Sequence, residues 1–209
     1  MLRTLTITGL LTIGALNAQQ PTEADLAKLA AHMDKALGLH AGMTVADIGT
    51  GPAVMHPLRI ARAVAPGGKV VCVDVSQSSV DKIKAQIDAA QITNVEVLLG
   101  KEDDPMLAAG TFDAILISNA YHEFTQPQVM LKHICDALKP DGTLVVVENY
   151  SIVNRSETRA AQIKRHDLAP DNLERELAAA GFTMKERVDP VLVNSPDRMR
   201  YLVRAEKTK

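Results

Sequence analysis

The sequence contains no tryptophan, and its three tyrosines and three phenylalanines make aromatic residues only 3% of its 209 residues. Proteins that bind single-stranded nucleic acid stack the bases on aromatic side chains, so this scarcity argues against such a surface. The sequence also lacks tracts of lysine and arginine, and its net charge is −2. A chain without clustered positive charge gains little by displacing counterions from a phosphate backbone. We therefore expect no nucleic-acid partner.

Cysteine is nearly absent too, since only Cys72 and Cys135 are present. Cys72 lies in the apolar, strand-like run 70–73, and Cys135 lies in a helix-like segment. We expect both to be free thiols that pack as small apolar side chains, and two such placements do not predict a disulfide. No two histidines or thiols stand at metal-ligand spacing along the chain, so the sequence predicts no metal site.

The N-terminus follows the three-part pattern of a secretory signal peptide. A positive charge at Arg3 precedes an apolar stretch over 5–16, and small residues around Ala18 follow it. The apolar stretch is shorter than the roughly 20 residues that span a bilayer, so no stable membrane span is expected. We expect residues 1–18 to direct export to the periplasm or beyond, and residues 19–209 to form a single domain. The alternative is an N-terminal helix of a cytoplasmic protein.

Strand-like and helix-like segments alternate from Pro21 onward. Thr22 and Asp25 form a candidate capping box, Gly38 ends the first helix, and Ser78 is the expected cap of a later helix. The expected strands are 43–48, 69–74, 94–99, 112–118, 143–148, 183–188 and 198–205. This order predicts an α/β domain with a doubly wound, mostly parallel sheet, helices on both faces, and an antiparallel hairpin at the C-terminal edge.

The first of these strands ends in a glycine loop, Asp47-Ile48-Gly49-Thr50-Gly51. In open α/β sheets the ligand binds beyond the carboxyl ends of the strands. Gly49 and Gly51 permit a tight turn and a close approach of the backbone to a ligand, and the following helix directs its free N–H groups there. Asp74 ends the second strand, where a carboxylate can accept hydrogen bonds from both hydroxyls of a ribose. The pattern therefore predicts a nucleoside ligand.

Two classes of nucleoside ligand use this arrangement. Dinucleotide-binding loops have the pattern G-x-G-x-x-G, and the last position is Val54 in this chain. Asp47 fits poorly beside a pyrophosphate and better near the ammonium group of an amino-acid moiety. S-adenosylmethionine therefore matches better than NAD, and an NAD-dependent oxidoreductase is the less favoured alternative.

Several segments together resemble class I S-adenosylmethionine-dependent methyltransferases, in the order of that family, from about residue 25 to 206. They are residues 47–51, Val73-Asp74, the strand from Phe112 to Asn119, Lys139-Pro140-Asp141-Gly142 and the C-terminal hairpin. The resemblance implies a seven-stranded sheet with one antiparallel strand and transfer of a methyl group from S-adenosylmethionine to a small-molecule acceptor. A non-catalytic protein that binds the same nucleoside on the same fold is the alternative.

The resemblance also implies which residues bind the cofactor. They are Asp47, Gly49, Thr50, Gly51, Asp74, Val75, Glu102, Asp103 and Asn119. The chain departs from the family pattern at Ala53, where the third glycine of the loop is usual. It departs again at Lys101, where a carboxylate is commonest. The acid that faces the adenine therefore stays open between Glu102 and Asp103.

The segment after the fourth strand, Asn119-Ala120-Tyr121-His122-Glu123-Phe124, lies where the family places residues near the transferred methyl group. The predicted catalytic residues are His122, as a general base, and Tyr121 or Glu123, which would orient it or the acceptor. The competing interpretation is that His122 and Glu123 only brace the next helix. His166 is a second candidate, and the basic residues near it either bind an anionic acceptor or form a solvated face.

Overall fold

The computed structural model describes residues 21–208, so the predicted export segment, residues 1–18, lies outside the described residues. The chain folds around one sheet of seven strands in the order β3-β2-β1-β4-β5-β7-β6. The strands are β1 Thr44–Ile48, β2 Lys69–Asp74, β3 Val95–Leu99, β4 Phe112–Ser118, β5 Leu138–Ser151, β6 Phe182–Ser195 and β7 Arg198–Lys207. Only β7 runs opposite to the direction that the other six strands share. The predicted α/β fold with one antiparallel strand is confirmed.

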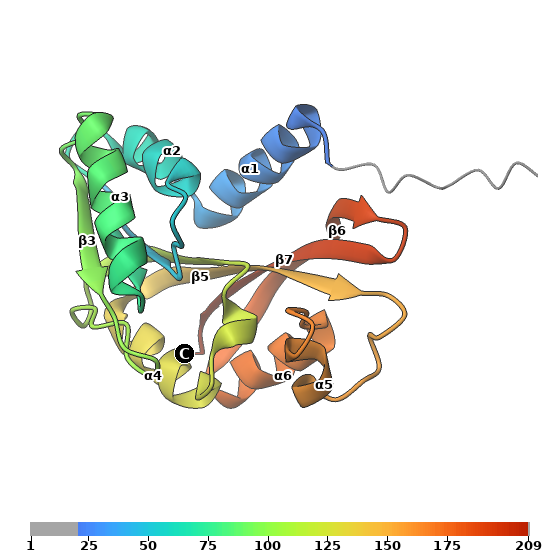
Figure 1. Cartoon of the computed structure of the whole chain (residues 1–209). Coiled ribbons are helices and arrows are strands. Elements are labelled where there is room, and N and C mark those ends of the chain that lie inside the picture. The colour runs from blue at the N-terminus through green and yellow to red at the C-terminus, as the bar shows by residue number, and fades with distance from the viewer. Residues whose placement is uncertain (1–20, 209) are drawn as a thin grey trace, which may run out of the picture.

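Helices cover both faces of this sheet (Figure 1). One face carries α1 Glu23–Leu37, α2 Met55–Val64 and α3 Gln77–Ala89. The other carries α4 Pro127–Ala137, α5 Arg159–Ile163 and α6 Pro170–Ala179. Successive side chains of a strand point to opposite faces of the sheet. In β1, Val45 therefore packs in the core beneath α1, α2 and α3, and Ala46 packs in the core on the face of α4 and α6. The strand order reverses between β1 and β4, which is where such sheets bind ligands.

Local signals in the sequence set most of the boundaries. Thr22 and Asp25 form the predicted capping box of α1, and Gly38 ends that helix in the left-handed conformation. The predicted cap at Ser78 is wrong, because the chain turns into α3 earlier and the Ser76 hydroxyl accepts the N–H of Ser79. The structure keeps the predicted bounds of β2 and β4 unchanged.

Two other expectations concern cysteine and the membrane. Cys72 is buried, Cys135 is half-buried, and both are free thiols, as predicted. Within residues 21–208, no helix combines the length and the apolar character needed to cross a bilayer.

The polar stretch that follows β5 has no clear periodicity, yet it is anchored through one buried amide, Gln162. Its Nε2 atom donates to the carbonyl oxygens of Asn154, Arg155 and Glu157 at 3.3, 2.9 and 3.0 Å. Its Oε1 atom accepts the backbone N–H of Ala169 at 2.7 Å. One side chain therefore ties both ends of this stretch together, including the turn that carries His166.

Replacing Gln162 with Ala should destabilise the protein by about 1–3 kcal/mol, because the buried N–H of Ala169 loses its acceptor. The same change should speed proteolysis within residues 152–167. Thermal unfolding and limited proteolysis measure the two effects. Lys164→Ala is the matched control, since Lys164 follows the same helix and is exposed. Equal unfolding temperatures for the two variants would contradict this role of Gln162.

Candidate functional site

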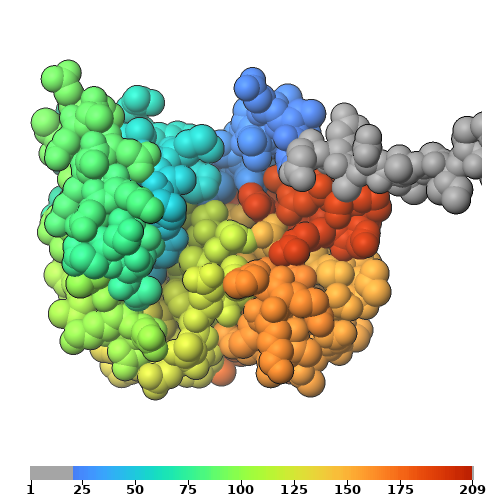
Figure 2. Space-filling model, viewed as in Figure 1, coloured from blue at the N-terminus to red at the C-terminus, as the bar shows by residue number. Residues whose placement is uncertain are grey.

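A cleft with a volume of about 510 Å³ opens at the carboxyl ends of β1, β2 and β4. Its size lies within the range of about 300–1,000 Å³ that is usual for small-molecule sites. Figure 2 shows α3, in green, to the left of the yellow-green segment around residue 120. The lining residues are Ile48, Gly49, Gly51, Pro52, Val73, Asp74, Val75, Ser76, Ser79, Lys101, Glu102, Pro105, Asn119, Ala120, Glu123, Phe124, Thr125 and Met130.

The glycine loop forms the floor of the cleft. Gly49 and Gly51 have φ angles of 72° and 66°, in the left-handed region that favours glycine. The backbone N–H groups of Gly49 and Thr50 both donate to the carbonyl of Val73, at 2.8 and 3.1 Å. A Cβ atom on Gly49 would lie 2.4 Å from the Cβ of Ala120, whereas one on Gly51 would meet nothing within 4 Å. Gly49 thus allows β1 and the turn after β4 to approach, and Gly51 faces open space.

Asp74 joins two loops at the rim of this cleft. Its Oδ2 atom accepts the N–H of Gly51 at 2.8 Å, and its Oδ1 atom accepts the N–H of Ser76 at 2.9 Å. A carboxylate offers about four lone-pair positions, so each oxygen keeps one for a further donor. The residues present therefore fit a ligand that offers a pair of hydroxyl groups at this point.

The other predicted cofactor residues divide into two groups. Val75, Glu102 and Asn119 line the cleft, as do Gly49, Gly51 and Asp74. Asp47, Thr50 and Asp103 do not line it. Between the two candidate acids for the adenine, this favours Glu102 over Asp103.

Asp47 and Thr50 stabilise the loop itself instead of lining the cleft. The Thr50 hydroxyl donates to the backbone carbonyl of Asp47 at 2.8 Å, which closes the turn. The Asp47 side chain is buried, and burial, with a smaller contribution from the charge of Asp74, raises its pKa to about 7. An acid with this pKa changes charge readily near neutral pH when a cation comes close.

The three predicted catalytic residues form a single 3-10 turn, η1 Tyr121–Glu123, and face different directions. Tyr121 is buried and donates its hydroxyl to Glu176 at 2.8 Å, away from the cleft. This placement favours a structural role for Tyr121. Glu123 lines the cleft, and two-thirds of its side chain is exposed.

His122 lies behind Glu123, in contact with the buried carboxylate of Glu148. Its Nδ1 atom lies 2.9 Å from Oε2 of Glu148, and its backbone N–H donates to Oε1 at 3.2 Å. Burial opposes the charged imidazolium, but the hydrogen bond and charge of Glu148 outweigh it and raise the pKa of His122 above its usual value. Because a carboxylate only accepts, Nδ1 carries a proton and Nε2 points toward Glu123 at 3.7 Å.

Asn119 links the turn after β4 to the C-terminal strands. Its φ angle is 55°, a left-handed conformation that asparagine tolerates better than most residues. Its side-chain oxygen accepts a hydrogen bond from Asn149 on β5. Asn149 in turn accepts from Asn194 and from Arg200 at 2.8 and 3.0 Å. The amide that faces the cleft is therefore held by three elements.

The basic residues near His166 do not form an open anion site. Arg155 contacts Asp171 and Asp189, Arg159 contacts Glu176 at 2.7 Å, and Arg165 pairs with Glu157. These carboxylates neutralise most of the positive charge, so the alternative of an anionic acceptor loses its support.

The sequence prediction missed several residues of the cleft, among them Ser76, Ser79 and Met130. Ser76 and Ser79 come from the first turn of α3, which begins where β2 ends at the rim of the cleft. Their place after Asp74 is a signal that the sequence contained. Met130 reaches the cleft from α4 only through packing, and no sequence pattern marks it.

A sheet of this order, with a glycine loop after β1 and an acid after β2, defines the class I methyltransferase fold. A family model described as "Methyltransferase domain" matches residues 39–193, so the chain belongs to that family. Family membership and fold together confirm S-adenosylmethionine as the expected cofactor of the class.

Two known methyltransferases resemble the chain in sequence. It is 35% identical over 115 residues to a protein-L-isoaspartate O-methyltransferase of Rhodopseudomonas palustris. The aligned residues cover 55% of this chain and 48% of that protein. It is 26% identical to a ubiquinone/menaquinone biosynthesis C-methyltransferase of Escherichia fergusonii, over 79% of the chain and 59% of that protein. The chain thus spans about half the length of the curated relatives it matches.

Among solved structures, a SAM-dependent methyltransferase from Aquifex aeolicus superposes with a TM-score of 0.72 at 24% identity, covering 88% of this chain and 93% of that one. At this identity the likeness establishes the fold.

Gly49→Ala should be less stable than Gly38→Ala, although both glycines have left-handed φ angles. Each substitution costs about 1–2 kcal/mol for the unfavourable conformation. A Cβ on Gly38 meets nothing within 4 Å, whereas one on Gly49 meets Ala120 at 2.4 Å and must displace the turn after β4. Denaturant unfolding of the two variants measures the difference. Equal stabilities would show that the close approach to Ala120 is not required.

Proposed function

We propose that this chain transfers a methyl group from S-adenosylmethionine to a small-molecule acceptor. The observation that carries the proposal is the cleft at the switch point of the sheet, where Gly49, Gly51 and Asp74 converge in a member of the methyltransferase domain family. When bound, the cofactor supplies a methyl group that is attached to a positively charged sulfur. After the transfer, the sulfur compound leaves as a neutral thioether.

Each end of the cleft has residues suited to one part of this task. Asp74 would accept the two ribose hydroxyls with the lone pairs that Gly51 and Ser76 leave free. Glu102 would accept the exocyclic amine of the adenine. Asn119 and Glu123 line the cleft after β4, where Asn119 would contact the cofactor and Glu123 would orient the acceptor. In-line transfer to a preactivated methyl group depends mainly on such alignment.

The acceptor is proposed to be a small molecule rather than a protein. The relatives include a C-methyltransferase of ubiquinone and menaquinone biosynthesis and an O-methyltransferase of protein L-isoaspartate. The Escherichia relative aligns with the larger share of the chain, 79% against 55%. The stretch between β5 and α6, which Gln162 anchors, approaches the cleft through His166, whose Nδ1 atom lies 3.9 Å from Oε1 of Glu123.

Replacing Asp74 with Ala should weaken S-adenosylmethionine binding by roughly 10- to 100-fold, since hydrogen bonds to a charged group contribute about 1.5–3 kcal/mol. Calorimetric titration measures the affinity, and thermal unfolding checks that the fold is retained. Asp88→Ala is the matched control, because Asp88 is an exposed acid on the neighbouring helix α3.

Titrating the unmodified protein with S-adenosylmethionine, its demethylated product and NAD separates the alternatives. Methyl transfer predicts binding of the first two and turnover with labelled cofactor in a screen of small acceptors. Binding without turnover throughout such a screen would favour a non-catalytic binding protein. Binding of NAD alone would favour an oxidoreductase and overturn the proposal.

The affinity for S-adenosylmethionine should rise with pH up to about 7 if the ammonium group of the cofactor lies near Asp47. Burial raises the pKa of Asp47 to about 7, so the free protein holds this acid mostly neutral at lower pH. A nearby cation favours the carboxylate, so binding releases a proton below pH 7, and affinity increases up to about tenfold per pH unit there.

Calorimetry between pH 5.5 and 7, in two buffers of different ionisation enthalpy, measures both the affinity and the proton release. This range lies below the usual pKa of an α-amino group, about 7.7–8.0. Asp47→Asn should remove the pH dependence. A wild-type affinity that does not change over this range would place the ammonium group away from Asp47.

A further inference from the structure

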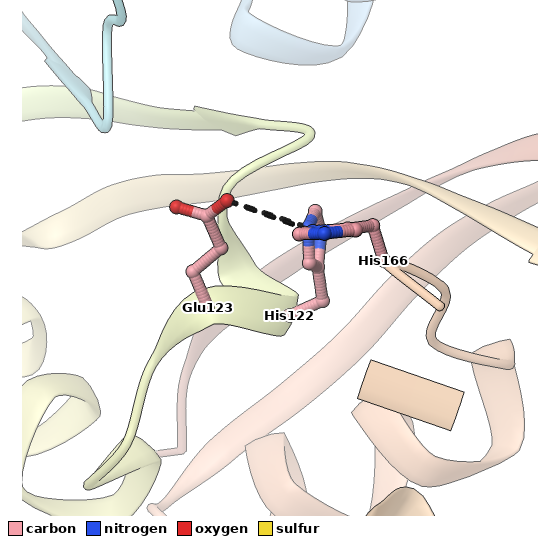
Figure 3. Close-up of side chains that lie close together, drawn as sticks. All are labelled: His122, Glu123 and His166. Atoms are coloured by element: carbon pink, nitrogen blue, oxygen red, sulfur yellow. Dashed lines mark ion pairs between the residues drawn. The ribbon is translucent and has the colours of Figure 1, made fainter. Parts of the chain in front are cut away.

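Three side chains from two distant segments meet beside the cleft, and one of them, Glu123, also lines it (Figure 3). His122 and Glu123 belong to the turn after β4, and His166 follows α5. One donor atom from each lies within 4.8 Å of the other two. Oε1 of Glu123 is 3.7 Å from Nε2 of His122 and 3.9 Å from Nδ1 of His166. Two imidazole nitrogens and a carboxylate oxygen form a donor set that suits divalent transition metals.

His122 is already oriented as a metal ligand would be. Glu148 is fully buried and accepts the proton of Nδ1, so Nε2 is the nitrogen that faces Glu123 and His166. A metal ion would take the place of the proton that Nε2 carries in the imidazolium. The backbone N–H of His122 donates to the same carboxylate, so the turn and the ring are fixed together. A carboxylate behind a histidine in this way fixes the tautomer and raises the basicity of the coordinating nitrogen.

His166 is held from its backbone, although 72% of its side chain is exposed. Its φ angle is 54°, a conformation that costs a non-glycine residue free energy and persists only where the surroundings impose it. Its N–H donates to Ile163, and its carbonyl accepts from Arg198 at 3.1 Å. Arg198 also pairs with the buried Asp167 at 2.8 Å. The imidazole is therefore free to rotate on a fixed backbone, beside Glu123.

The charge around the cluster favours a cation. The carboxylates of Glu123 and Glu148 lie 3.7 and 2.9 Å from the ring nitrogens of His122, and among the described residues neither carboxylate has a lysine or arginine within 4.0 Å. Four donors around zinc stand about 3.3 Å apart, since zinc–nitrogen bonds measure about 2.0–2.1 Å. The exposed side chains of Glu123 and His166 need only small rotations to reach that spacing.

We propose that His122, Glu123 and His166 bind one divalent metal ion, zinc being the best match, with an open coordination position toward the cleft. This inference rests on the proposed function, and it implies that the acceptor is a molecule with a hydroxyl or thiol group. Coordination lowers the pKa of that group, its proton passes to water, and the lone pair of the oxygen or sulfur forms the new bond to the methyl carbon. The carbon–sulfur bond of the cofactor breaks at the same time, and its electron pair leaves on the sulfur.

The proposal differs from the sequence-based expectation of no metal site and of His122 as a general base. A metal ion on Nε2 occupies the lone pair that a base would use, so the two roles exclude each other. Metal binding can be measured without cofactor or acceptor, which separates this proposal from the proposed function.

The test is a titration of the chelator-treated full chain with zinc by calorimetry, and with cobalt by visible absorption. We expect one zinc per chain at micromolar affinity or tighter, and cobalt bands typical of fewer than six ligands. His166→Ala and Glu123→Ala should each weaken zinc binding at least tenfold. Both side chains are exposed, so neither change should alter thermal unfolding.

His133→Ala is the matched control, because His133 also lies near a carboxylate, Asp104, at 4.0 Å, but outside the cluster. It should leave zinc affinity unchanged. Absence of zinc binding, or equal binding by wild type and His166→Ala, would overturn the proposal. S-adenosylmethionine affinity, measured on the same samples, should be unaffected by His166→Ala. If the unmodified protein binds zinc but does not bind S-adenosylmethionine, the result counts against the proposed function and not against the metal site.

Discussion

The carboxylate of Asp74 is the constraint on which the cleft depends. It accepts one N–H from the glycine loop after β1 and another from the start of α3, so two loops from neighbouring strands take up one fixed arrangement. The Val73 carbonyl reinforces this by accepting from Gly49 and Thr50. Parallel pairing places the ends of β1 and β2 at the same edge, with Ile48 opposite Val73. These hydrogen bonds therefore form the pocket without a ligand.

A second buried carboxylate, Glu148, organises the opposite side of the cleft. It lies on β5 and fixes the turn after β4 through the backbone and the ring of His122. Removing the His122 ring would leave the buried carboxylate of Glu148 without its partner, at a cost of about 3–5 kcal/mol. The polar network of Asn119, Asn149 and Arg200 lies beside it. Glu148 and the Asn119 network together hold the turn Tyr121–Glu123 in place, although the side chain of Glu123 is exposed.

Much of the fold could be predicted because its signals are local. The capping box at Thr22, the apolar runs of β2 and β4 and the glycine loop each depend on residues close together in the sequence. Errors arose where two local signals competed. Ser78 and Ser76 are both suitable caps, and the hydrogen bond from Ser76 N–H to Asp74 decides between them. Tyr121 looked like a site residue because of its neighbours, but its hydroxyl is bound by Glu176 from α6.

The sequence by itself determined the class of fold, the family and the position of the nucleoside cleft, because alternation of strands and helices, glycines and a strand-ending acid are short-range patterns. Only the tertiary structure decided which polar side chains meet. His166 is separated from His122 and Glu123 by α4, β5 and α5, and it reaches them only because the stretch after β5 packs beside the turn that carries them. Long-range packing sets such contacts, and spacing along the chain does not encode them.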